Sequence, residues 1–411
     1  MVIKGRLLHI FKGFDFFKMP LKLSVIIIML FNVSVYGYSS STQDTISSGN
    51  SIKIALVMPF EVSRNSEVDP ANPDSPWIHP FSMPALHFYE GARLAIDSLA
   101  RIGINANISC FETPVDSLGM KRLVSMLARD NFDLLVANIP DKLIQLAVDK
   151  TADFGIKLIL TQALSSTSIK GKSNCALAYA SAATQCSLVV ERFLKKYPEG
   201  NFVILKGKSQ REKDAAEVFR NAVYNLKSKM SAAKMVDLSS STFSSVSSLL
   251  SPERQNIILF VSSDEQLVNT GLTSLSKSCP PNTIICGMPT WMNFESIDFM
   301  SFGRIQISLF DNNYIDLLDP NRLKFRKRFV NTYFDDPLSS AYAGFDLLTC
   351  LVPLVNEKPN AKLKEILAAL KRNQNKVFDF KQLPEGGFEN HQITVTFLED
   401  YRFVDIENLE D

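Results

Sequence analysis

Histidine and cysteine are scarce in this sequence, and their spacing is not that of a metal site. Its 411 residues include 4 histidines and 6 cysteines. No two histidines form an H-x-x-x-H or H-E-x-x-H motif, and no two cysteines form a C-x-x-C motif. A metal centre built from these ligands is therefore not expected, and we predict no metal site and no cofactor.

Signatures of common catalytic sites are also missing. The sequence contains no G-x-S-x-G motif of a serine nucleophile. The letters GKS occur at 171–173 and at 207–209, but a phosphate-binding loop needs a glycine five residues earlier, where Ser166 and Phe202 stand. Adjacent carboxylates such as Asp335 and Asp336 lie in turn-like stretches that favour solvation. We predict that the chain is not an enzyme and has no catalytic residues.

A strong excess of charge of one sign is absent. The 44 Lys and Arg residues balance 43 Asp and Glu residues, for a formal net charge of +1. The bulk charge therefore favours neither nucleic acid nor an anionic membrane surface as a partner. A hydrophobic content of 46% is that of an ordinary globular protein with sizeable cores.

Long apolar runs are confined to the N-terminus. The run LSVIIIMLFNVSV at 23–35 follows several basic residues and precedes a polar stretch. At about 13 residues it is shorter than the roughly 20 needed to span a bilayer. We predict a signal peptide at 1–37, starting at Met1 or Met19, then a flexible linker at 38–50. The mature protein would be periplasmic or secreted, with no lipid-anchor cysteine beside the cut and no stable membrane span.

From Ser51 onward, short β-branched runs alternate with amphipathic helical windows, a pattern typical of parallel sheets covered by helices. The polar segment QALSSTSIKGKSN at 162–174 interrupts the pattern, and a second series begins with a strand at 175–180. We predict an α/β fold of two Rossmann-like lobes joined by three crossovers, with a cleft between them. The first lobe comprises 51–163 and 311–375, and the second 174–310 and 378–411.

Two stretches depart from this alternation. About 25 residues separate the first predicted strand, 52–60, from the first long helix, 84–102, where 2–6 residues are usual. We predict that this loop, with Trp77, His79 and Phe81, forms a lid on the cleft or a surface for a partner. The segment from Trp291 to Tyr314 reads as an aromatic-rich loop.

Polar residues just beyond strand ends are the candidate ligand contacts, because the carboxyl ends of parallel strands leave backbone groups and helix N-termini open. Serine and asparagine at such positions also commonly cap the next helix. Together with one aromatic residue, the candidates are Asn138, Gln162, Ser165, Ser166, Tyr179, Ser181 and Trp291.

Several segments, in this order, resemble the type I periplasmic binding proteins, which include branched-chain amino acid receptors of ABC importers. They are IKIALVMPF, FYEGARLAIDSLARIGIN, FGIKLILTQALSS, CALAYASAATQCSLVVERFL and FRKRFVNTYFDDPLSSAYAGFDLLTCLVPLV. GMPTWMNFESID and the ending GGFENHQITVTFLEDYRFVDIEN resemble more closely the binding-protein-like domain that follows lysin-motif repeats in Bacteroidetes-type bacteria. The resemblance covers nearly the whole chain from Ile52, and no such repeat is visible here.

The resemblance implies a secreted, non-enzymatic protein that captures a small ligand between two lobes by hinge closure. This sequence departs from the transporter receptors at three ligand-contacting turns, which here read LLVANIPD, KSQREKDAA and GMPTW. The alternative is a degenerate binding-protein fold that serves as a cell-envelope scaffold for a protein partner. An exposed apolar patch in the 291–314 segment or the long first loop would favour this alternative.

Overall fold

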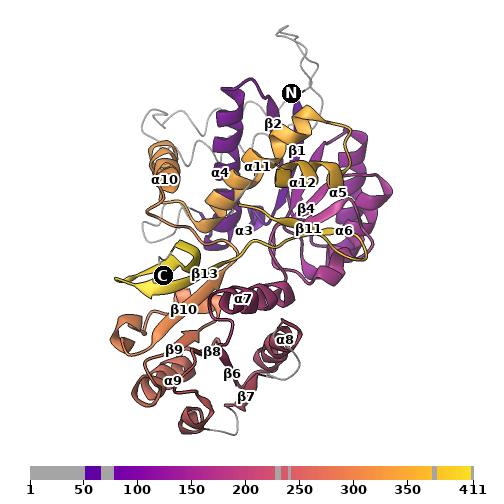
Figure 1. The fold of residues 1–411 in the computed structure, drawn as a ribbon. Coiled ribbons are helices and arrows are strands. Elements are labelled where there is room, and N and C mark those ends of the chain that lie inside the picture. The colour runs from indigo at the N-terminus through magenta and orange to yellow at the C-terminus, as the bar shows by residue number, and fades with distance from the viewer. Residues whose placement is uncertain (1–50, 66–77, 227–232, 239–241, 373–376, 409–411) are drawn as a thin grey trace.

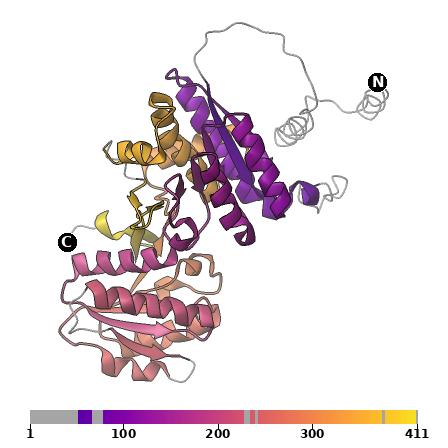
Figure 2. The same cartoon turned by 90° about the vertical axis from the view of Figure 1, so that its right-hand side faces the viewer.

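The computed structural model describes residues 51–65, 78–226, 233–238, 242–372 and 377–408. The predicted signal peptide at 1–37, the linker at 38–50 and Trp77 lie outside the described residues. Figures 1 and 2 show two lobes stacked one above the other and joined by segments that run between them.

The first lobe is built around a sheet with helices on both faces. Its strands are β1 (Ile52–Met58), β2 (Ala106–Glu112), β3 (Leu134–Ala137), β4 (Leu158–Leu160), β5 (Cys175–Leu177), β11 (Phe380–Gln382) and β12 (Phe388–Asn390). Its helices are α3 (Val62–Asn65), α4 (Met83–Ala100), α5 (Ser117–Arg129), α6 (Asp141–Asp153), α10 (Pro320–Tyr333), α11 (Ser339–Glu357) and α12 (Leu363–Arg372), with short 3-10 turns η2 (Pro80–Ser82) and η3 (Ser166–Ile169).

The second lobe repeats this plan. Its strands are β6 (Asn201–Lys206), β7 (Lys234–Asp237), β8 (Asn256–Val261), β9 (Thr283–Cys286), β10 (Gln306–Asp311), β13 (Thr394–Glu399) and β14 (Arg402–Asp405). Its helices are α7 (Ala182–Lys196), α8 (Gln210–Leu226) and α9 (Glu265–Ser278), with 3-10 turns η4 (Phe243–Ser245), η5 (Ser247–Leu249), η6 (Pro289–Asn293), η7 (Phe299–Phe302) and η8 (Ile406–Asn408).

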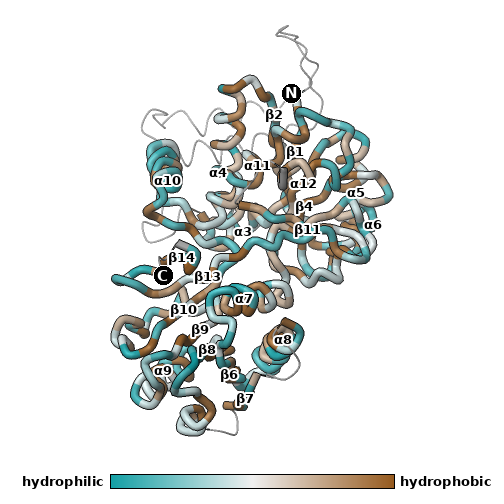
Figure 3. The backbone as a smooth tube through the Cα atoms, in the orientation of Figure 1, coloured by the Kyte–Doolittle hydropathy of each residue, from teal (hydrophilic) through white to brown (hydrophobic). Residues whose placement is uncertain are grey.

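The first five strands of the two sheets have the same order, whereas the sixth strand is parallel to its neighbour in the first sheet and antiparallel in the second. The first sheet runs β2-β1-β3-β4-β5-β12-β11 and the second β7-β6-β8-β9-β10-β13-β14. In each sheet the first five strands are parallel. The first strand of the lobe has the second strand on one side and the third on the other, so the strand order reverses at this point. The central strands, such as β1 and β8, are nearly continuous apolar runs because both sheet faces are covered by helices. The backbone tube in Figure 3 is mostly teal along the outer helices α6 and α10 and carries more brown toward the sheets. The predicted fold class is confirmed.

The predicted lobe boundaries require a correction at two crossovers. Strand β5 was expected to open the second lobe, but it pairs with β4 in the first sheet. Strands β11 and β12 also belong to the first sheet, where β12 lies parallel to β5. The chain therefore crosses between the lobes just after β5, after β10 and after β12. Strand pairing decides these boundaries, and local sequence patterns do not encode it.

The aromatic-rich segment 291–314 also differs from expectation, because it is not a loop throughout. It contains β10, which pairs with β9 and β13 in the second sheet. Strands β13 and β14 form a terminal hairpin, and its turn places Asp400 and Tyr401 at positive φ. This conformation is the one that a two-residue hairpin turn requires.

Helices α4 and α11 approach each other so closely that their backbones touch. A Cβ atom on Gly91 would lie 1.8 Å from the carbonyl oxygen of Ala341, and one on Gly344 would lie 2.1 Å from that of Phe88. Only glycine fits at these two positions. This contact fixes α11 across the first lobe and so positions the chain that enters from the second crossover.

Candidate functional site

The side chains of Glu389 and Asn390 join the third crossover to the first. The backbone N–H of Ser181 donates to Glu389 Oε1, and Asn390 Nδ2 donates to the Ala178 carbonyl at 3.0 Å. The Ser181 hydroxyl accepts from Thr184 N as the N-cap of α7. Ser181, which is buried, therefore anchors the start of the second lobe.

Gln162 closes the gap between the ends of β3 and β4 in the first lobe. Its Oε1 accepts from Ile139 N at 2.9 Å, and its Nε2 donates to the Ile139 carbonyl. Both groups of the side-chain amide thus bond to the backbone of one residue, as the N–H and C=O groups of paired strands do. The amide of Gln162, a predicted ligand contact, is thus occupied by the backbone.

Three other predicted contacts lie along the same side of the first lobe. Asn138 follows β3 directly, and its backbone donates to Val57 O at 2.9 Å while its carbonyl accepts from Thr113. Ser165 caps the 3-10 turn η3 by accepting from Thr167 N, and Ser166 begins that turn. Ser165 is exposed, and Asn138 and Ser166 are half-buried.

In the second lobe, Glu212 joins the ends of β6 and β8. One carboxylate oxygen accepts from the N–H and hydroxyl of Ser209, each at 2.8 Å. The other accepts from Ser262 Oγ at 2.9 Å and Ser263 N at 2.7 Å. Burial opposes ionisation of Glu212, but these hydrogen bonds outweigh it and lower its pKa. A half-buried carboxylate therefore lies at the point where the strand order reverses, which is where open α/β sheets usually bind ligands.

Trp291 fills the neighbouring space between β8 and β9. Its indole lies against Gly287, where a Cβ atom would come within 2.2 Å of the ring. Its Nε1 donates to the Ser262 carbonyl at 2.7 Å, and the ring packs edge-on against Phe260 and parallel to Phe299. The side chain is 0% exposed. The expectation that Trp291 contacts a ligand is corrected, because its indole is part of the second-lobe core.

The same packing bears on whether the 291–314 segment presents an exposed apolar patch to a partner. Phe302 and Phe310 are buried, and Phe294 and Phe299 pack partly buried against the core cluster that contains Trp291. Every described aromatic side chain of this segment is buried or half-buried. The patch favouring a partner surface is therefore not found here.

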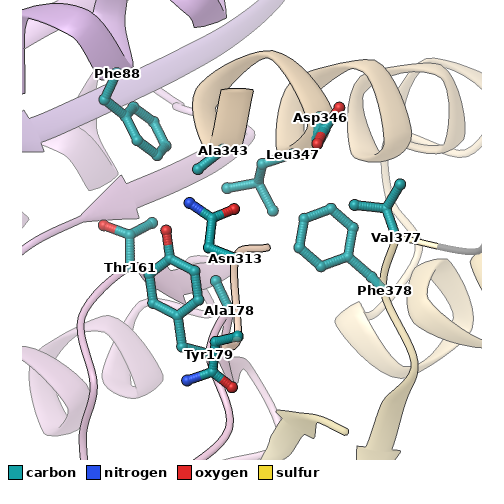
Figure 4. A pocket seen from close by; sticks show the side chains of 11 residues that line it. Phe88, Thr161, Ala178, Tyr179, Asn313, Ala343, Asp346, Leu347, Val377 and Phe378 are labelled. Atoms are coloured by element: carbon teal, nitrogen blue, oxygen red, sulfur yellow. The ribbon is translucent and has the colours of Figure 1, made fainter. Parts of the chain in front are cut away.

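A small cavity lies where the crossovers meet the first lobe (Figure 4). The space open to the centre of a water molecule is about 30 Å³, enough for roughly two waters. The lining residues are Phe88, Thr161, Ala178, Tyr179, Asn312, Asn313, Ala343, Asp346, Leu347, Val377 and Phe378.

The cavity wall is partly polar. Burial raises the pKa of Tyr179 to about 12, so this predicted site residue is a neutral phenol. Asn312 donates to the Ala180 carbonyl at 3.4 Å, while its Oδ1 is buried without a hydrogen-bond partner. Burial raises the pKa of Asp346, although Arg322 opposes this by donating to both carboxylate oxygens at 2.8 Å.

The base of the long first loop is fixed by one asparagine. Asn65 Nδ2 donates to the Phe60 carbonyl and to Ser82 Oγ, and its Oδ1 accepts from His79 N at 2.8 Å. The chain thus leaves and returns at one anchored point. Phe81 lies next to it, 66% exposed, with the Arg64 guanidinium 5.2 Å from the ring centre. The predicted role of this loop as a lid or a partner surface stays a prediction.

Two further properties concern the described residues alone. Within these ranges, no cluster of three histidine, cysteine or carboxylate side chains is placed to hold a metal ion. No helix of the described chain combines the length and the apolar character needed to cross a bilayer.

The shared order of the first five strands and the three crossovers define the class of fold. Two doubly wound lobes connected in this way have the type I periplasmic-binding-protein fold. Comparison with solved structures agrees, while neither a protein-family model nor a curated protein sequence matches the chain.

Three solved structures illustrate the similarity. A branched-chain amino acid ABC transporter protein from Rhodospirillum rubrum aligns with a TM-score of 0.63 and 15% identity, over 87% of this chain and 100% of the other. An ABC transporter substrate-binding protein from Desulfitobacterium hafniense gives 0.53 and 13%, over 87% and 100%. The C-domain of LpoA from Haemophilus influenzae, a regulator of PBP1A, gives 0.55 and 12%, over 86% and 99%. At these identities the likeness concerns the fold.

Asn312 and Asp346 at the cavity and Glu212 in the second lobe were not selected in the sequence analysis. Glu212 has two roles. Its local role was readable, because Ser209-x-x-Glu212 is a capping box at the start of α8. Its second role, accepting from residues after β8, was not readable. Ser262 and Ser263 are 50 and 51 residues away in sequence, and only the pairing of β6 with β8 brings them together.

Proposed function

We propose that this chain is a non-enzymatic protein of the cell envelope that uses the two-lobed fold as a scaffold for a protein partner. The observation that carries this proposal is the closed strand-end edge of the second lobe. Glu212 takes four hydrogen bonds there, and Trp291 fills the adjoining space. A solute that binds at these strand ends would have to compete with Ser209, Ser262 and Ser263 for this half-buried carboxylate or find its contacts elsewhere.

The first lobe supports the same proposal. Gln162 uses its amide on the backbone of Ile139, and the cavity beside the crossovers holds roughly two waters. The similarity to LpoA adds a precedent for this fold in a protein named as a regulator of another protein. Export to the envelope rests on the predicted signal peptide at 1–37.

A thermal-shift screen of the full mature chain against amino acids, sugars and short peptides tests the proposal. A scaffold gives no stabilisation. A solute present at 100 times its dissociation constant would contribute about 2.7 kcal/mol, and a reproducible shift of that size from one class would overturn the proposal. Mass spectrometry of small molecules that copurify with the protein from the producing cells provides a second, unbiased readout.

Solute capture in the cleft is a second candidate, favoured by one observation. The buried Asn312 Oδ1 at the cavity has no partner and would accept a hydrogen bond from an N–H or O–H group. Hinge closure would bring Asn138 and Ser166 toward the second lobe and enlarge the set of contacts. For this candidate, Asn312→Leu should abolish any solute-dependent shift, while Asn174→Leu, outside the cavity, provides a matched control.

A further inference from the structure

Helix α10 has one buried face and one open face. Phe325, Phe329 and Tyr333 are buried in a cluster with residues of α4 and α11. On the other side, Leu323 and Val330 are exposed, and Phe334 is 72% exposed at the end of the helix. Their spacing i, i+7, i+11 places these three on one stripe. Figure 1 shows α10 at the outer edge of the first lobe.

Exposed leucines also flank both ends of the helix in the sequence. Leu317 and Leu318 precede the N-cap Asp319 and are 55% and 59% exposed, and Leu338 follows at 43%. Phe334 occupies the C-cap with φ of 59°, a left-handed conformation in which glycine or asparagine is usual. Helix termination therefore does not account for an exposed aromatic ring at this position.

Positive charge accompanies the apolar stripe. The helix contains Arg322, Lys324, Arg326, Lys327 and Arg328 and no acidic residue. Arg322 and Arg326 are bonded to Asp346 and Asp336. Lys324 and Lys327 are exposed and form no ion pair with another described residue. The middle of the open face thus combines exposed apolar groups with uncompensated positive charge.

Acidic residues border this face at both ends, with Asp316 and Asp319 before the helix and Asp335 and Asp336 after it. A lipid surface of uniform negative charge would meet these carboxylates beside Leu317, Leu318 and Phe334. A protein partner can match a pattern of mixed charge residue by residue, so the arrangement favours protein over membrane.

We propose that the open face of α10, together with Leu317, Leu318 and Leu338, docks an amphipathic segment of a partner protein whose apolar side chains are flanked by carboxylates. The carboxylates pair with Lys324 and Lys327, and the apolar groups cover the stripe of Leu323, Val330 and Phe334. This inference rests on the proposed scaffold function and names the surface and the chemistry of its partner.

In-cell photo-crosslinking of the full chain tests the surface. A benzoylphenylalanine is placed at Val330, at Phe81 beside the first loop, or at Phe154, an exposed background position on the same lobe. Each is made in the native sequence and in the double variant Lys324→Glu with Lys327→Glu. The double variant Lys208→Glu with Lys277→Glu changes the net charge equally at exposed positions of the second lobe.

The proposal expects a protein adduct from Val330 whose crosslinked segment is apolar and rich in Asp or Glu. Its yield should fall about tenfold in Lys324→Glu with Lys327→Glu and stay unchanged in the control pair. No adduct at Val330, or an adduct unaffected by the lysine variant, overturns the proposal. Adducts that form only with benzoylphenylalanine at Phe81 overturn the assignment of the surface to α10 and leave the scaffold function intact. A thermal shift induced by a solute counts against the scaffold function itself.

Vesicles of phosphatidylglycerol and phosphatidylethanolamine provide the test against the membrane. The proposal expects the purified chain to stay in the supernatant when these vesicles are sedimented. Cosedimentation that the lysine variant abolishes would overturn the docking of a protein segment at this face. Unchanged thermal midpoints of both double variants establish that altered adduct yields do not arise from unfolding.

Discussion

Replacing Glu212 with alanine removes the carboxylate that joins the ends of β6 and β8. Four hydrogen bonds of 2.7 to 2.9 Å are lost. A hydrogen bond to a charged group contributes about 1.5–3 kcal/mol when its partner is left buried, but the donors of Ser209 are exposed and can bond to water. The loss comes mainly from the hydrogen bond of Ser262, which is 0% exposed, with a smaller contribution from the bond of Ser263. We therefore expect the free energy of unfolding to fall by about 2–4 kcal/mol.

The pH dependence of this loss follows from the lowered pKa of Glu212. A carboxyl whose pKa is lower in the folded state stabilises above its unfolded value of about 4.3, and that stabilisation disappears as the pH falls through the folded pKa. The difference between the native chain and Glu212→Gln should therefore be present at neutral pH and shrink below about pH 4.

Urea denaturation followed by tryptophan fluorescence measures both effects, because Trp291 lies next to Ser262 in the second-lobe core. Glu217→Ala is the matched control on the same helix. Glu217 is 42% exposed and pairs only with Arg220 among the described ion pairs, so a loss below about 1 kcal/mol is expected. Equal effects of Glu212→Ala and Glu217→Ala would refute the idea that Glu212 closes this edge.

Three further substitutions test the packing around the site. Gly344→Ala brings a Cβ atom within 2.1 Å of the Phe88 carbonyl oxygen. We expect the free energy of unfolding, measured by chemical denaturation, to fall by about 3 kcal/mol. An unchanged denaturation midpoint would contradict the close contact of α4 and α11. Arg322→Ala leaves Asp346 buried without its cation, and stability should fall by about 2–4 kcal/mol at neutral pH. That loss should diminish in acid as Asp346, whose pKa is already raised, becomes protonated; a pH-independent loss would argue against this explanation. Trp291→Ala should cost about 3–5 kcal/mol in the second-lobe transition, whereas a near-neutral effect would reopen the question of a ligand role.

Local sequence patterns predicted most of the elements. The strand predicted at 52–60 is β1 (Ile52–Met58), and the helix predicted at 84–102 is α4 (Met83–Ala100), because strand and helix periodicity are properties of consecutive residues. β10 was missed in an aromatic-rich stretch that resembled a loop. β11 and β12 were missed because each has 3 residues and carries little periodicity.

The candidate site was less readable than the fold. A polar residue after a strand can face a ligand, cap a helix or bond to the neighbouring loop, and the sequence is the same in each case. Gln162 bonds to Ile139, and Ser181 caps α7. Tyr179 lines the cavity. The choice among these roles depends on the neighbours that the sheet brings near.

The sequence by itself determined an α/β chain of two lobes, since alternating strand and helix signals are local and survive in any arrangement of the elements. Only the tertiary structure decided where the lobes divide and which side chains occupy the strand ends. β5 joins the first sheet because its backbone pairs with β4. Glu212 closes the second lobe because β6 and β8 are neighbours. Contacts of this kind join residues far apart in the chain, and their free energy depends on the pairing of strands.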